Sequence, residues 1–182
     1  MLTRAKSVTS PPGNRQQRVT QFPPRAEMCT KEEVLAFEFP GLIRRLKDKL
    51  GLSDDEARAL FEDTKRFLYL CGVNPDGRWG PTTKIDAGWH EFLMFTKEYR
   101  EFCHQHFGRF IDHTPNDPDK PRDIQKPKRT LQLAIQTFGA LSLSWVYTDK
   151  NGAPVLGPHN VHDMNIVNMS TPCDSCGCSP CS

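Results

Sequence analysis

The side chains best suited to chemistry gather in residues 85–115, which read IDAGWHEFLMFTKEYREFCHQHFGRFIDHTP. These 31 residues hold four of the six histidines, seven of the seventeen aromatic residues and one cysteine. Imidazole, thiolate and carboxylate groups bind metals and move protons, and aromatic rings shield such groups from water. The stretch therefore indicates either a functional site or an unusually polar core.

Four residues of this stretch form a candidate metal site. His90 follows Asp86 by four residues, so both side chains project from one face of a helix. Cys103 lies on the next expected helix, and His113 follows Gly108, where the chain can turn back. If it does, His90, Cys103 and His113 form a three-ligand site for Zn²⁺, with Asp86 as a fourth ligand or as a partner that orients His90. Ligand type alone leaves iron and copper open.

The same residues also have purely structural interpretations. His90 can be a buried histidine that donates to Asp86, and Cys103 can be a small core residue. Trp89 and Tyr99 are expected to support the site by packing. The spacing H-x12-C-x9-H is wider than the usual zinc spacings.

Three functions therefore stay open. The first is a metal-binding module. The second is a small metal- or thiol-dependent enzyme that uses the same residues. The third is a metal-free interaction domain in which the motif is structural core. Neither catalytic residues nor a substrate follow from the pattern, and a partner protein or small molecule stays unidentified.

A second candidate site lies in the C-terminal tail. Cysteines at positions 173, 176, 178 and 181 give the pattern C-x2-C-x-C-x2-C, with Asp, Ser, Gly and Pro between them. Small spacers would let Cys173, Cys176, Cys178 and Cys181 converge on one soft ion such as Zn²⁺ or Cu⁺. A flexible tail with incidental or disulfide-paired thiols is the alternative.

The elements that must position the first site are expected to be helices. Capping boxes at Thr30–Glu33 and Ser53–Glu56 each precede an apolar pattern with helical spacing. Further helices are expected over 40–50, 84–95, 97–107 and 131–147, the last with a strand as alternative. Three prolines between residues 116 and 128 argue against long regular structure there. The sequence thus predicts a mainly α fold, a compact irregular helical bundle with long loops.

Composition divides the chain into three parts. Residues 1–27 are basic, polar and Pro-containing, which predicts a disordered leader. Residues 28–150 form the expected helical domain, and residues 151–182 a loop and Cys-rich tail. The net charge is +2, so no global field attracts nucleic acid or a membrane surface. No apolar run reaches the roughly 20 residues of a membrane span. The N-terminus lacks the apolar segment of a signal peptide, which favours a cytoplasmic location.

The order and spacing of the motif resemble a known family. D-x-x-W-H, T-x-x-Y-x-x-x-C and G-x-F-I-x-H resemble the core of the glycine-rich domain-containing protein-like family. The matching positions are Asp86, Trp89, His90, Thr96, Tyr99, Cys103, Gly108, Phe110 and His113. The resemblance covers about residues 60–115. It implies a mostly helical domain with its site at the polar motif residues, and it brings no activity with it. That family often has a second histidine two positions after the first, where this chain has Phe92.

Overall fold

The chain folds mainly as α-helices, which confirms the predicted fold class. The computed structural model describes residues 29–114 and 123–158 and the backbone of residues 177–179. The predicted leader and most of the predicted tail lie outside these residues. The helices of the described part are α1 (Lys31–Leu35), α2 (Pro40–Leu50), α3 (Asp54–Val73), α4 (Thr83–Leu93), α5 (Thr96–Phe107), α6 (Lys126–Phe138) and the 3-10 helix η1 (Leu143–Trp145).

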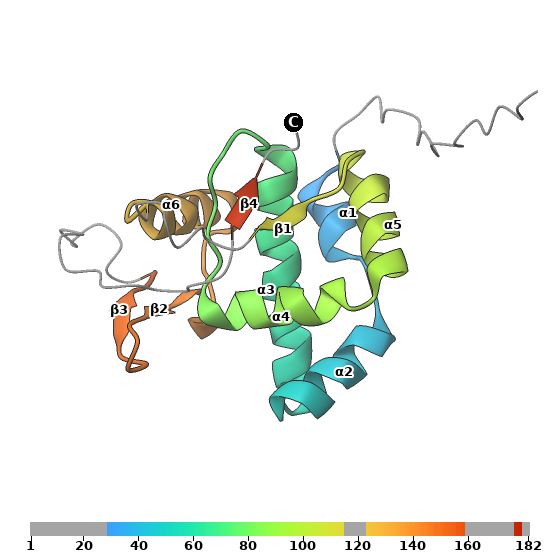
Figure 1. The fold of residues 1–182 in the computed structure, drawn as a ribbon, viewed down its shortest axis with the longest axis horizontal. Helices are drawn as coiled ribbons and strands as arrows, with labels where there is room; N and C mark the ends of the chain where they lie inside the picture. The colour runs from blue at the N-terminus through green and yellow to red at the C-terminus, as the bar shows by residue number, and fades with distance from the viewer. Residues whose placement is uncertain (1–28, 115–122, 159–176, 180–182) are drawn as a thin grey trace, which may run out of the picture.

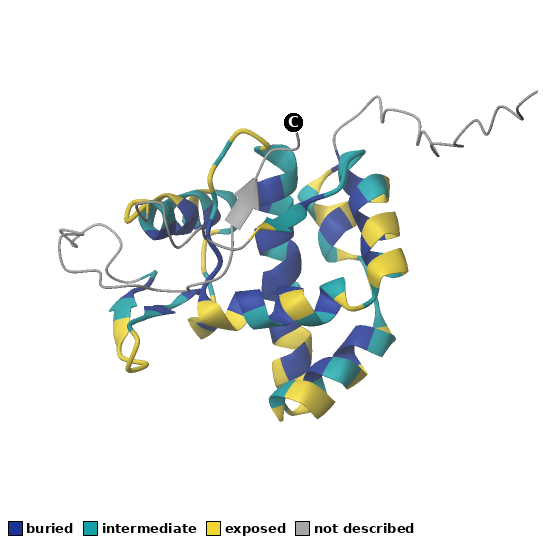
Figure 2. Ribbon diagram, in the orientation of Figure 1, coloured by how far each residue is buried: buried dark blue, intermediate teal, exposed yellow. Residues whose placement is uncertain are grey.

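Helix α3 is the centre of the fold, and the other α-helices pack around it (Figure 1). Its capping box is present as predicted: the backbone N–H of Glu56 donates to the side chain of Ser53, and the Glu56 carboxylate accepts from the Ser53 N–H. Three acidic residues in the first turn suit the positive end of the helix dipole. Figure 2 shows that most residues in the middle of α3 are buried, whereas its first turn is exposed.

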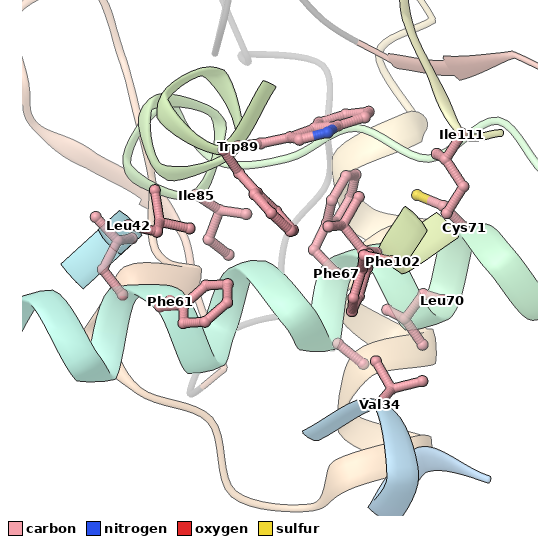
Figure 3. Close-up of a cluster of buried hydrophobic side chains, with 14 of the residues drawn as sticks. Val34, Leu42, Phe61, Phe67, Leu70, Cys71, Ile85, Trp89, Phe102 and Ile111 are labelled. Carbon is pink, nitrogen blue, oxygen red and sulfur yellow. The ribbon is translucent and has the colours of Figure 1, made fainter. Parts of the chain in front are cut away.

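The core is built from large apolar side chains of several helices. Figure 3 shows Phe61, Phe67 and Leu70 of α3 against Ile85 and Trp89 of α4 and Phe102 of α5. All six are at most 4% exposed. Burial of a side chain of this size contributes about 1.5–3 kcal/mol, so this cluster fixes α4 and α5 on α3. Both helices carry the candidate site residues.

The predicted helix over 131–147 is wrong in its bounds. Helix α6 begins earlier, at Lys126, because Pro127 is tolerated in the first turn of a helix, and it ends at Phe138 before Gly139. Leu143–Trp145 then forms η1, and Tyr147–Thr148 the strand β2. A buried carboxylate holds this segment: Asp63 of α3 accepts from Trp145 Nε1 at 2.9 Å and from Ser142 Oγ at 2.5 Å.

Short strands replace part of the predicted C-terminal loop. Strand β2 pairs antiparallel with β3 (Pro154–Leu156). Strand β1 (Asp112–Thr114) pairs antiparallel with β4 (Gly177–Ser179), with His113 opposite Cys178 in the register. The expected tail therefore contains at least one strand that adds to the domain. No helix in the described part of the chain is long and apolar enough to cross a membrane.

Candidate metal centre

Helix α4 presents the first two residues of the centre. Its N-cap is Thr82, whose side chain accepts from the Ile85 N–H at 3.2 Å and donates to the Ser144 carbonyl at 2.6 Å. The helix start is thus fixed to η1. From this start, Asp86 and His90 lie one turn apart on the same face, as their spacing predicted. The Nδ1 atom of His90 lies 3.2 Å from Asp86 Oδ2 and 2.9 Å from the Asp86 carbonyl oxygen.

The third residue comes from β1, after the chain has turned back at the end of α5. Gly108 ends that helix with a φ of 67°, a left-handed conformation that glycine adopts without strain. Six residues after the helix, His113 places its Nε2 atom 3.1 Å from Asp86 Oδ1. The rings of His90 and His113 lie edge to face with centroids 4.1 Å apart. The predicted turn therefore brings His113 to the α4 pair.

The three side chains can bind one ion together. One ligand atom from each of Asp86, His90 and His113 lies within 4.8 Å of the other two. Ligands of a tetrahedral Zn²⁺ sit about 2.0–2.1 Å from the ion and so about 3.3 Å from each other. The two contacts of Asp86 with the imidazoles, at 3.1 and 3.2 Å, are already close to that spacing. These two contacts use different carboxylate oxygens of Asp86, Oδ1 toward His113 and Oδ2 toward His90.

The centre is buried on one side and open on the other. The side chains of Asp86 and His113 are 7% and 8% exposed, whereas that of His90 is 48% exposed. A buried carboxylate between two imidazoles is stabilised by their N–H groups. The exposed ring of His90 marks the side from which water or a small molecule reaches the group.

A buried hydrogen-bond chain supports His113 from behind. The Trp89 ring lies against the His113 ring, with centroids 4.4 Å apart. Trp89 Nε1 donates to the Tyr99 hydroxyl at 3.0 Å, and that hydroxyl donates to the Ile111 carbonyl at 2.7 Å. Trp89 and Tyr99 thus connect α4, α5 and the residues that lead into β1.

The structure does not bring Cys103 into this centre. Among the described residues, the group that could hold a metal contains Asp86, His90 and His113 but not Cys103. Its thiol is fully buried behind them, beside Tyr99 and the Ile111 backbone. Burial raises the pKa of Cys103 to about 12, although hydrogen bonding with the Ile111 backbone and with Tyr99 lowers it. Burial also raises the pKa of Tyr99 well above its usual value, and the nearby Cys103 adds to this.

Asp86 takes a more central position than its sequence spacing indicated. The sequence predicted it on the helix face of His90, either as a fourth ligand of the shared ion or as a partner that orients His90. In the structure its two carboxylate oxygens face one imidazole each, from α4 and from β1. The second contact joins residues 27 positions apart, which helical spacing could not reveal. Of the four tail cysteines, only the backbone of Cys178 is described.

Together, the fold and the centre define a mainly α-helical domain with an Asp–His–His cluster at its surface. Residues 29–137 match the UCP032817-like family, and the chain belongs to that family. Because this family is an uncharacterised one, membership assigns no reaction to the chain. No curated protein and no solved structure matches the chain.

Proposed function

We propose that this domain binds a divalent transition metal through Asp86, His90 and His113, and that Zn²⁺ is the ion. The observation that supports this most directly is the distance of at most 4.8 Å between the ligand atoms of the three residues. Two imidazoles and one carboxylate are a ligand set that Zn²⁺ accepts. The same set also suits Fe²⁺ in sites with open positions, so Fe²⁺ is the competing ion.

The structure around the centre supports the proposal because it holds the ligands in advance. Asp86 and His113 are nearly buried, and the ring of Trp89 restricts the orientation of His113. A site with prepositioned ligands loses less conformational entropy when it binds an ion. Metal and protons compete for these groups, so binding should weaken as the imidazoles become protonated.

A metalloenzyme is the second candidate function. Three protein ligands leave one position of a tetrahedral ion for water or substrate, which is the pattern of catalytic rather than structural zinc. The 48% exposure of His90 favours this candidate because it leaves that side of the centre open. We do not propose the thiol enzyme, because a pKa of about 12 keeps Cys103 protonated.

Metal counting on tag-free protein tests the proposal. The full chain should carry serines at the four tail cysteines, so that only the domain contributes. After chelator treatment and dialysis, we expect it to take up one equivalent of Zn²⁺. The variant His113→Asn should take up far less, whereas the control His104→Asn should match the parent. A folded parent protein that binds no metal, or a His113→Asn variant that binds it equally well, would refute the proposal.

The other expectations stay predictions. A second metal ion on Cys173, Cys176, Cys178 and Cys181 would appear as extra zinc in the unaltered chain and disappear on truncation after Thr171. The cytoplasmic location and the resemblance to the glycine-rich domain-containing protein-like family also stay predictions. Neither alters the choice of Asp86, His90 and His113 as ligands.

A further inference from the structure

A second group of reactive side chains lies between α1 and α5, away from the metal centre. Cys29, just before α1, carries a reduced thiol that is 4% exposed. Its Sγ atom lies 3.2 Å from Nδ1 of His106, a residue of α5 that is 77 positions away and equally buried. The Cys29 thiol donates to Oε2 of Glu33 at 2.9 Å. No local sequence pattern indicates this pairing, since the partners lie on separate elements.

These side chains line a small cavity. Its volume is about 480 Å³, and its lining residues are Cys29, Glu33, Ala36, Gln105 and His106. Glu33, Ala36 and Gln105 are exposed residues, so they form the opening to solvent, while the thiol and the imidazole lie deeper. Helices α1 and α5 lie side by side at this place (Figure 1). This volume is large enough to hold a molecule of a few carbon atoms beside the sulfur.

We propose that Cys29 and His106 form a reactive thiol–imidazole pair that exchanges with small disulfides. A thiol becomes nucleophilic when it loses its proton, and an imidazole within hydrogen-bond distance both accepts that proton and stabilises the thiolate. The distance of 3.2 Å between Sγ and Nδ1 suits this transfer. The phenyl rings of Phe37 and Phe102, with centroids 6.0 and 4.9 Å from the His106 ring, hold the imidazole in place.

The exchange needs no group beyond the protein and the disulfide. The Cys29 S–H leaves its hydrogen bond to Glu33 and gives its proton to His106 Nδ1. The thiolate then attacks one sulfur of the small disulfide. The Cys29–sulfur bond forms as the disulfide bond breaks, and the leaving thiolate takes the proton from the imidazolium. Cys29 ends in a mixed disulfide and is oxidised, while one half of the reagent is reduced to a thiol.

Glu33 lowers the reactivity of the Cys29 thiol and determines which disulfides it prefers. Its carboxylate is fixed by the Thr30 N–H at 2.9 Å in the capping box of α1, so it stays beside the sulfur. A negative charge at 2.9 Å opposes the formation of a thiolate. The same charge favours a disulfide that carries amino groups over one that carries carboxylates. A cationic disulfide is therefore the class of partner that fits the cavity.

The rate of mixed-disulfide formation near pH 7 tests this proposal on the full chain. The probes are cystamine, which is cationic, and dithiodipropionate, which is anionic, with each cysteine followed by peptide mass spectrometry. Cys103 serves as the internal control, because its raised pKa keeps it inert. We expect cystamine to modify Cys29 at least about tenfold faster than Cys103. Cystamine should also react at Cys29 faster than dithiodipropionate.

Two variants separate the roles of the partners. In His106→Asn the amide can keep a hydrogen bond to the sulfur but accepts no proton, so the Cys29 rate should fall by about tenfold or more. Glu33→Gln can keep the capping box, and it should speed alkylation of Cys29 by neutral iodoacetamide while reducing the preference for cystamine. Equal rates for Cys29 and Cys103, or an unchanged Cys29 rate in a folded His106→Asn protein, would overturn the proposal.

Discussion

The two halves of the central motif differ in their access to solvent. Asp86, His90 and His113 form a polar cluster with one side open to water, whereas Cys103 and Tyr99 lie fully buried directly behind it. Trp89 joins the halves, because its ring contacts His113 and its N–H contacts Tyr99. Apart from that of Trp89, all of these side chains could bind a metal or move a proton. The difference shows that access to solvent decides which of them can bind an ion and which only support the site.

The largest expected effect is the loss of the carboxylate that both imidazoles share. Asp86→Asn removes the negative charge and one ligand atom, so Zn²⁺ affinity should fall by about 100-fold or more. Competition with a chromophoric zinc chelator measures this. Cys103→Ala is the matched variant from the buried half and should keep the parental affinity. If Cys103→Ala loses as much affinity as Asp86→Asn, the buried half also binds the ion and the division is wrong.

The next effect concerns the packing of α4, which carries Asp86 and His90, against α3. A Cβ atom at Gly88 of α4 would lie 2.5 Å from Thr64 Oγ1 and 3.1 Å from Leu60 Cγ of α3. Gly88→Ala should therefore push α4 off α3 and lower the free energy of unfolding by about 1–3 kcal/mol.

Urea unfolding of Gly88→Ala measures the change, with Lys84→Ala as the control on an exposed position of the same helix. The control should stay within about 0.5 kcal/mol of the parent. Equal stability of the two variants would show that α4 and α3 pack less closely than the structure has them.

These positions also show what the sequence could and could not predict. Capping boxes, helical spacing and the turn at Gly108 depend on residues that are close in the chain, and they predicted the helices and the face shared by Asp86 and His90. The contact of His113 with Asp86 needs the packing of α4 against α5 and β1. The burial of Cys103 needs the whole core. The start of α6 does not follow from the sequence pattern, because proline usually breaks a helix, whereas Pro127 lies in the first turn, where it is compatible with one.

A smaller effect is expected from the hydrogen-bond chain of the buried half. Tyr99→Phe removes the hydroxyl that donates to the Ile111 carbonyl and accepts from Trp89. Two buried polar groups then lack this partner, at a cost of about 1–2 kcal/mol in unfolding free energy. Because Ile111 leads into β1, zinc affinity should also decrease, but by less than in Asp86→Asn. A variant with normal stability and affinity would show that packing alone positions His113.

The smallest effect is the alkaline response of the buried thiol. The folded pKa of Cys103 is about 12, against an ordinary value of 9.0. The unfolded chain therefore releases this proton first, and stability should fall as pH rises above about 9. Near pH 10 the loss from this group is about 1.4 kcal/mol relative to neutral pH. Cys103→Ala lacks it, and the variant also loses the part of the raised Tyr99 pKa that Cys103 causes, which acts in the same direction. The cavity left by the substitution lowers stability equally at every pH. Unfolding free energies measured between neutral pH and pH 10 should thus converge for the two proteins, and parallel curves would mean that water reaches Cys103.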